Sequence, residues 1–255
     1  MPATLSFETY LDGIYEASAR LREEARQAGL AAAVPTCPHW NVGHLLAHQG
    51  MVQRWAATTI QGEEPRDSET VEQEGLSTDD PGVWLQDACN DLVDVLRSIP
   101  TDADLPFFMS SPLPGRESWA RRQCHEATIH SVDALGARLG YRPDTDDVDL
   151  SPGFAADGVD ELLSCFMPRR TFDLRSSSPV TVIVHTTDTG DSWLLSFGQD
   201  LPQVRRDRTS DHADAVVSGD AVSLYLALWN RGSNISCEGR DVLSLWRDRM
   251  KVTWA

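Results

Sequence analysis

The spacing of apolar residues changes near residue 150 and divides the chain into two kinds of sequence. Before this point, apolar side chains recur every three or four residues, which is the period of a helix buried on one face. Beyond it, residues 180–187 read VTVIVHTT, and such β-branched runs bounded by turn residues are typical of strands. The sequence therefore predicts an α+β protein of two domains.

The first domain, residues 1–145, is expected to be a bundle of four amphipathic helices. Each helix begins at a capping residue or near a proline, as helix starts commonly do. The expected starts are Ser6, Asn41, Pro81 and Glu117. Residues 61–80 carry eight acids against one arginine without an apolar period, which predicts a solvated loop. The cores of such bundles often house metal sites.

The second domain, residues 150–255, is expected to be a smaller α+β unit that follows an acidic linker bracketed by prolines. The turn sequence Asp188-Thr189-Gly190-Asp191 indicates a hairpin between two strands. The expected elements are a helix at 155–167, strands at 180–187, 192–197 and 215–218, and helices at 221–229 and 241–250.

Charge and composition limit the possible partners and the compartment. Lys and Arg total 22 against 39 Asp and Glu, a net charge of −17, which excludes nucleic acid and anionic membranes as favourable partners. The chain has neither a run of 18 apolar residues nor a signal-peptide pattern, so it is expected to be neither membrane-spanning nor secreted. Five scattered cysteines without a CxxC pair suit a reducing cytoplasm. The sequence does not specify an oligomeric state.

Five of the seven histidines lie in two expected helices and are the main candidates for chemistry. His125 and His130 resemble an HExxH pair with one residue too many, and at about 100° per residue they lie about 140° apart, which excludes a shared metal. Glu126 and His130 are four residues apart and face the same way. On the other helix, His44 and His48 have the same spacing.

Two histidines and a carboxylate are a common ligand set for catalytic zinc. Such sites use three protein ligands and keep one position open. Glu126 and His130 with one histidine of the earlier helix would complete the set. Spacing alone does not choose between His44 and His48, and any single pair four residues apart also arises by chance.

Two longer patterns resemble a known family. Residues 40–48, WNVGHLLAH, are similar to the W-x-V-x-x-L-x-x-H signature of DinB-like metal-binding bundles. Residues 122–133 are similar to the R-x-x-H-E-x-x-x-H-x-x-D signature of the mycothiol-dependent maleylpyruvate isomerase family. The resemblance implies a DinB-like four-helix bundle followed by a sterol-carrier-like α+β domain. It also implies that His48, Glu126 and His130 are the zinc ligands, with His44 as an outer partner or an alternative ligand.

The resemblance further implies a metalloenzyme that uses Zn²⁺ and mycothiol as cofactors. A low-molecular-weight thiol at the open zinc position would lose its proton near neutral pH and attack a small electrophilic substrate. The outcome would be cis–trans isomerisation of a maleylpyruvate-like compound, or S-transfer where the substrate has a leaving group. Arg54, Arg122 and Arg231 are the candidate cations for holding a carboxylate-bearing substrate or thiol.

Two other functions remain open on the sequence. The protein could bind a metal or a small apolar ligand without catalysis, or it could be a zinc-dependent hydrolase with the same three ligands. The tryptophans of the first domain, Trp40, Trp55 and Trp119, are interpreted as bundle core rather than as substrate platforms.

Overall fold

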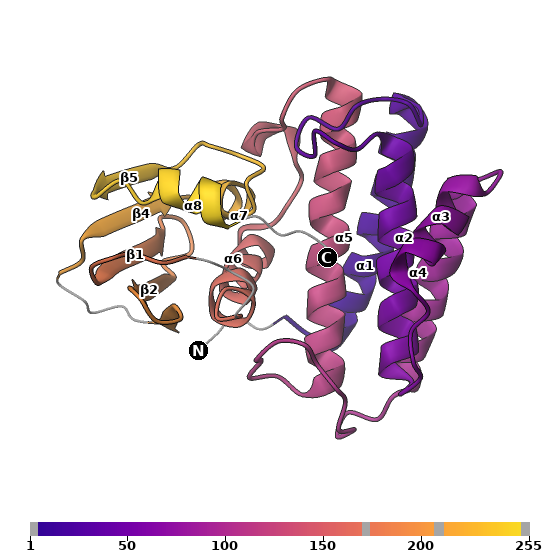
Figure 1. Ribbon diagram of the computed structural model, residues 1–255, viewed down its shortest axis with the longest axis horizontal. Coiled ribbons are helices and arrows are strands. Elements are labelled where there is room, and N and C mark those ends of the chain that lie inside the picture. The colour runs from indigo at the N-terminus through magenta and orange to yellow at the C-terminus, as the bar shows by residue number, and fades with distance from the viewer. Residues whose placement is uncertain (1–4, 170–173, 207–211, 251–255) are drawn as a thin grey trace. The chain divides into compact units, whose positions relative to one another are not determined.

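The computed structural model describes residues 5–169, 174–206 and 212–250, and its internal contacts divide the chain into two compact units (Figure 1). The first unit consists of Leu5–Phe108 and Pro112–Pro143. The second consists of Met109–Ser111 and the described residues from Asp144 onward. Together they form the two-domain α+β layout that the sequence predicts.

The first unit is a bundle of long helices that run side by side (Figure 1). Helix α1 packs along α5 and α4, and α2 packs against α3, α4 and α5. The elements are α1 (Phe7–Ala28), α2 (Val42–Ile60), α3 (Ser68–Ser77), α4 (Pro81–Ser98) and α5 (Gly115–Leu139).

The helix boundaries follow from capping chemistry. The side chains of Ser6 and Asn41 accept hydrogen bonds from backbone N–H groups in the first turns of α1 and α2, as the sequence predicts. Pro81 occupies the first turn of α4, where its missing N–H is not needed. Helix α5 ends at Gly140, whose φ of 76° suits a residue without a side chain.

Residues 61–80 correct the prediction of a solvated loop, because they contain helix α3. The side chain of Asp67 caps this helix by accepting from the backbone N–H of Thr70 at 2.8 Å. Val71 is buried against Met51 and Val52 of α2. The buried residues of this helix are Val71 and Gly75. With so few buried apolar side chains, the acidic sequence shows no apolar period that would predict a helix.

The packing of α2 on α5 sets the register of the bundle. Leu45 and Leu46 of α2 share one apolar cluster with Ala134 and Ala137 of α5. One turn further along α2, His48 therefore faces the preceding turns of α5.

The second unit contains a five-stranded sheet in the order β3-β2-β1-β4-β5. Strands β1 and β4 are parallel, with Val184 opposite Val217, and the other neighbours are antiparallel. The strands are β1 (Val180–Thr186), β2 (Ser192–Phe197), β3 (Gln203–Arg206), β4 (Ala215–Gly219) and β5 (Ser236–Gly239). The short outer strands β3 and β5 were not predicted from the sequence.

Helices cover the apolar side of this sheet. They are α6 (Pro152–Asp160), which continues into a π-helical segment (Glu161–Phe166), α7 (Ala221–Leu228) and α8 (Leu243–Arg249). The indole of Trp246 on α8 donates to the carbonyl of Leu228 at 2.8 Å. Beneath it lies an apolar cavity of about 10 Å³. Among the described residues, no helix is long and apolar enough to cross a membrane.

Candidate metal centre

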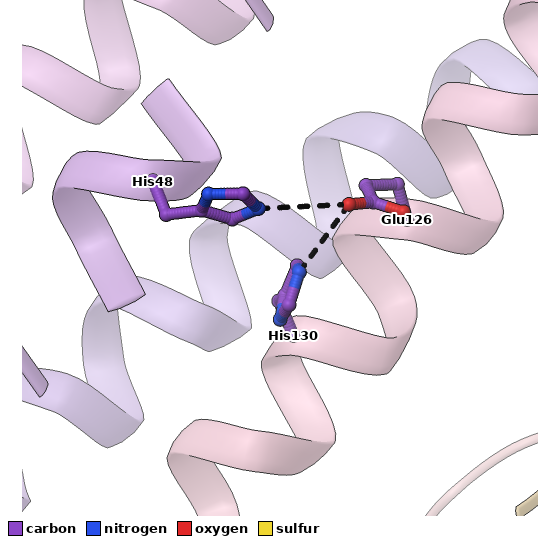
Figure 2. Close-up of side chains that lie close together, drawn as sticks. All are labelled: His48, Glu126 and His130. Carbon is purple, nitrogen blue, oxygen red and sulfur yellow. Dashed lines mark ion pairs between the residues drawn. The ribbon is translucent and has the colours of Figure 1, made fainter. Parts of the chain in front are cut away.

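Three buried side chains from two helices converge in the bundle (Figure 2). Nε2 of His48 on α2 lies 3.9 Å from Oε1 of Glu126 on α5, and Nε2 of His130 lies 3.3 Å from the same oxygen. One potential ligand atom from each residue lies within 4.8 Å of the others. The structure thus brings together the three residues that the family resemblance implied.

Local helix geometry explains this convergence. Glu126 and His130 are separated by about one turn of α5, so both side chains leave the same face of the helix. His48 approaches from α2, whose start is fixed by the Asn41 cap. His48 is 1% exposed, Glu126 8% and His130 6%, so all three are withdrawn from bulk water.

Each α5 residue of the cluster has a charged partner on the side away from the convergence point. Arg122 donates to Oε2 of Glu126 at 2.9 Å, which leaves Oε1 directed at the two imidazoles. Asp133 lies 3.0 Å from Nδ1 of His130, and since a carboxylate only accepts, His130 donates this hydrogen bond. The Nε2 atom of His130 is therefore the one that faces Glu126.

The pKa values follow from burial and from these partners. Burial lowers the pKa of His48, which favours its neutral form. Burial alone would raise the pKa of Glu126, but the two imidazoles and the charge of Arg122 hold it well below its usual range. Burial opposes the charged form of His130, yet Asp133 and Glu126 together raise its pKa to about 9. Without a metal, the cluster at neutral pH therefore contains an ionised Glu126 and a protonated His130.

The donor set fits a tetrahedral zinc ion. Zinc–nitrogen and zinc–oxygen distances near 2.1 Å place neighbouring ligand atoms about 3.4 Å apart. The separations of 3.3 Å and 3.9 Å between the histidine nitrogens and Oε1 are close to this value. Two imidazoles and one carboxylate also leave a fourth position for an external ligand.

Trp40 packs against the apolar cluster of the bundle, as interpreted from the sequence, but it is only half buried. Its ring also lies 4.7 Å from the ring of His48 and 6.0 Å from that of His130. Trp55 and Trp119 do lie together, 5.4 Å apart, in an aromatic cluster with Phe107 and Phe108.

The other predicted site residues lie elsewhere, apart from Arg122. His44 is outside the cluster, and its Nδ1 lies 2.8 Å from Oδ1 of Asn41 at the start of α2. The guanidinium of Arg54 lies 3.9 Å over the ring of Trp84 and donates to the carbonyl groups of Gly50 and Trp84. These contacts direct the guanidinium of Arg54 towards α4, and its assignment as a cation for a substrate or thiol remains a prediction.

Arg231 belongs to the second unit. Its guanidinium donates to the carbonyl of Trp229 at 2.8 Å, close to the end of α7. Its assignment as a substrate-binding residue remains a prediction.

Sequence reasoning gave no role to Asp133 or Thr36 at the metal centre. The hydroxyl of Thr36 donates to Oδ1 of Asp133 at 2.5 Å, although 97 residues separate them. Asp133 falls within the second signature, three residues after His130, and that spacing was the available signal. Nothing in the sequence marks Thr36.

The fold and the cluster define a class of protein: a two-domain α+β chain with a His–Glu–His ligand set inside a helical bundle. The family model of the mycothiol maleylpyruvate isomerase N-terminal domain matches residues 11–135. The model of the corresponding C-terminal domain matches residues 153–242. The chain therefore belongs to the mycothiol-dependent maleylpyruvate isomerase family.

Solved structures agree with this fold. A crystal structure of the mycothiol-dependent maleylpyruvate isomerase has a TM-score of 0.62 and 13% sequence identity over 92% of this chain and 93% of that one. A histidine-to-alanine mutant of the same name gives a TM-score of 0.63 with the same identity and coverage. At this identity the likeness establishes the fold alone. No curated protein matches the sequence closely enough to be counted as a relative.

Proposed function

We propose that the protein is a zinc-dependent enzyme that uses mycothiol to attack a small electrophilic substrate. The observation that carries this proposal is the buried convergence of His48, Glu126 and His130 with a ligand set suited to zinc. Family membership supports the thiol, because both domain models bear the name of the mycothiol-dependent isomerase.

In this proposal His48, Glu126 and His130 hold the metal. Bound there, zinc would supply the positive charge that lowers the pKa of a thiol and keeps it as the reactive thiolate near neutral pH. Arg122 keeps one oxygen of Glu126 occupied, and Asp133 fixes which nitrogen of His130 faces inward. The ring of Trp40 packs beside the ring of His48.

The reaction follows from thiolate chemistry at an activated carbon. In isomerisation, the sulfur adds to one carbon of a cis double bond conjugated to a carbonyl group, and the π electrons move to the carbonyl oxygen. Rotation about the new single bond and expulsion of the same thiolate then give the trans isomer. In S-transfer, the sulfur instead displaces a leaving group, which departs with its electron pair.

The apolar cavity beneath Trp246 gives the apolar-ligand alternative no support. Its volume of about 10 Å³, within the part of the second unit that the structure describes, is near the lower limit for a single water molecule and far below the volume of an acyl chain. A hydrolase would use the same three ligands, so the two catalytic functions are separated by their dependence on thiol.

The test is a screen of electrophiles with the zinc-loaded protein, with and without mycothiol. Chromatography would report cis–trans conversion, and mass spectrometry would report thiol conjugates. We expect turnover that requires mycothiol and is lost in His48→Ala. His44→Ala is the matched control, because it removes a histidine one turn away that does not join the cluster. Turnover of esters or amides without thiol would favour the hydrolase.

A further inference from the structure

The loop between α1 and α2, residues 34–40, reaches the metal centre from outside the two ligand-bearing helices. Its shape is fixed by its own backbone. The N–H of Val34 donates to the carbonyl of Trp40 at 3.2 Å, that of Cys37 to Val34 at 3.0 Å, and that of Trp40 to Cys37 at 2.9 Å. A bridge between Ala33 and Asn41 closes its base. The loop is thus a structured element that can hold side chains in place.

A chain of hydrogen bonds connects this loop to a ligand of the metal centre. Thr36 donates from its hydroxyl to Oδ1 of Asp133, and the other carboxylate oxygen accepts from Nδ1 of His130 at 3.0 Å. Asp133 has no exposed surface, so water cannot easily replace either contact. The thiol of Cys37, 3.8 Å from Oδ2, adds a weaker contact because S–H is a poor donor.

We propose that Thr36 is a positioning residue for the metal centre and acts through Asp133 to keep Nε2 of His130 directed at the metal. The inference rests on the proposed function, because it assumes that His130 is a ligand. It assigns to the α1–α2 loop a role in metal affinity that the ligand residues alone do not account for.

The physical reason lies in the freedom of an imidazole ring. The ring of His130 can rotate about its Cβ–Cγ bond, which turns Nε2 away from the metal and brings Cε1 into its place, unless Nδ1–H has a fixed acceptor. Asp133 is that acceptor, but its carboxylate can itself rotate. Since Thr36 occupies Oδ1, the carboxylate is held with Oδ2 towards the ring. Loss of the Thr36 hydroxyl removes this constraint on the carboxylate and takes a hydrogen bond away from a buried oxygen, which costs free energy.

The test measures zinc affinity by chelator competition in Thr36→Val, Thr36→Ser, Asp133→Asn and the double variant Thr36→Val/Asp133→Asn. Measurements from pH 7 to 9 separate a change in proton competition from a change in ring orientation. We expect affinity to fall about 10- to 100-fold in Asp133→Asn and about 10-fold in Thr36→Val, the range typical for outer partners of metal ligands. Thr36→Ser keeps the hydroxyl and should bind zinc as the wild type does.

The double variant tests whether Thr36 acts through Asp133. If it does, the double variant binds zinc no more than about 2-fold more weakly than Asp133→Asn alone, because coupled residues are not additive. Thr128→Val is the matched control: its hydroxyl donates to the carbonyl of Cys124 within α5, between the two ligands. This variant should keep wild-type affinity.

The visible spectrum of the cobalt-substituted protein gives a readout that does not depend on turnover. We expect the spectrum to change in Thr36→Val and to return in Thr36→Ser. Wild-type affinity and spectrum in Thr36→Val would overturn the inference, as would losses that multiply in the double variant. If Asp133→Asn fails to fold, the Thr36 pair still decides the question. A wild type that binds no zinc would instead refute the proposed function itself.

Discussion

Metal binding should release one proton from His130, and this is the sharpest consequence of the electrostatics of the site. The pKa of His130 is raised to about 9 in the metal-free protein, so the ring is protonated at pH 7 and must lose that proton before Nε2 can bind a cation. His48, with its lowered pKa, is already neutral, and Glu126 is already ionised. A single proton therefore competes with the metal.

The size of the effect follows from the distance between pH and pKa. Removing a proton of pKa about 9 at pH 7 costs about 2.7 kcal/mol, since each unit corresponds to about 1.36 kcal/mol. Apparent zinc affinity should therefore increase about 10-fold from pH 7 to pH 8 and level off above pH 9, for a total gain of about 100-fold.

Two assays check this expectation on the purified, metal-free chain. Chelator competition at controlled free zinc gives the affinity at each pH, and calorimetry in two buffers with different ionisation enthalpies counts the protons released. In Asp133→Asn the plateau should begin at a lower pH, because Asp133 is one of the groups that raise the pKa of His130. Equal affinity at pH 7 and pH 9, with no proton released, would refute the reasoning.

Three other predictions concern stability. Arg122→Met should destabilise the metal-free protein by up to about 3–5 kcal/mol, because the buried Glu126 carboxylate loses one of its two neighbouring cations and keeps only protonated His130. The loss should be smaller after zinc loading. Urea denaturation of both forms would show this, and equal losses would contradict it. The melting temperature of the metal-free protein should also fall as the pH rises from 7 towards 9. The raised pKa of His130 contributes stability that is complete below pH 6.5 and is lost as the pH rises through about 9. A melting temperature that does not change over this range would contradict the prediction. Gly75→Ala should destabilise the folded protein by about 1–3 kcal/mol, since the new Cβ would lie 2.8 Å from the Trp84 ring. Gly153→Ala is the control, because a Cβ at that position meets no atom within 4 Å. Thermal melts should show a lower melting temperature for Gly75→Ala than for Gly153→Ala, and equal values would contradict the prediction.

Local signals in the sequence were sufficient to predict the long helices. Ser6, Asn41 and Pro81 mark helix starts by chemistry that acts within one turn, and the structure confirms them. Helix α3 escaped prediction because its stability comes from packing on α2, which an acidic segment does not reveal. Strands β3 and β5 escaped because their short, largely exposed sequences carry little apolar alternation.

In the candidate site too, local relations could be predicted from the sequence, whereas contacts between distant residues could not. The spacing of Glu126 and His130 predicted that they share a face of one helix, because that relation is local. Spacing alone did not choose between His44 and His48; the family resemblance chose His48, which the packing of α2 on α5 brings to the cluster. The contact of Thr36 with Asp133 joins residues 97 positions apart and depends on the path of the loop between α1 and α2. No sequence pattern predicts such a contact.

X-ray absorption at the zinc edge, before and after addition of mycothiol, tests the central claim most directly. The account predicts one zinc ion per chain with two imidazole nitrogens and one carboxylate oxygen, and then a new sulfur ligand at about 2.3 Å once the thiol is added. In Glu126→Ala and His130→Ala the metal should be lost, whereas His44→Ala should keep it. A metal environment that gains no sulfur, or zinc retained in full by the Glu126 and His130 variants, would contradict the account.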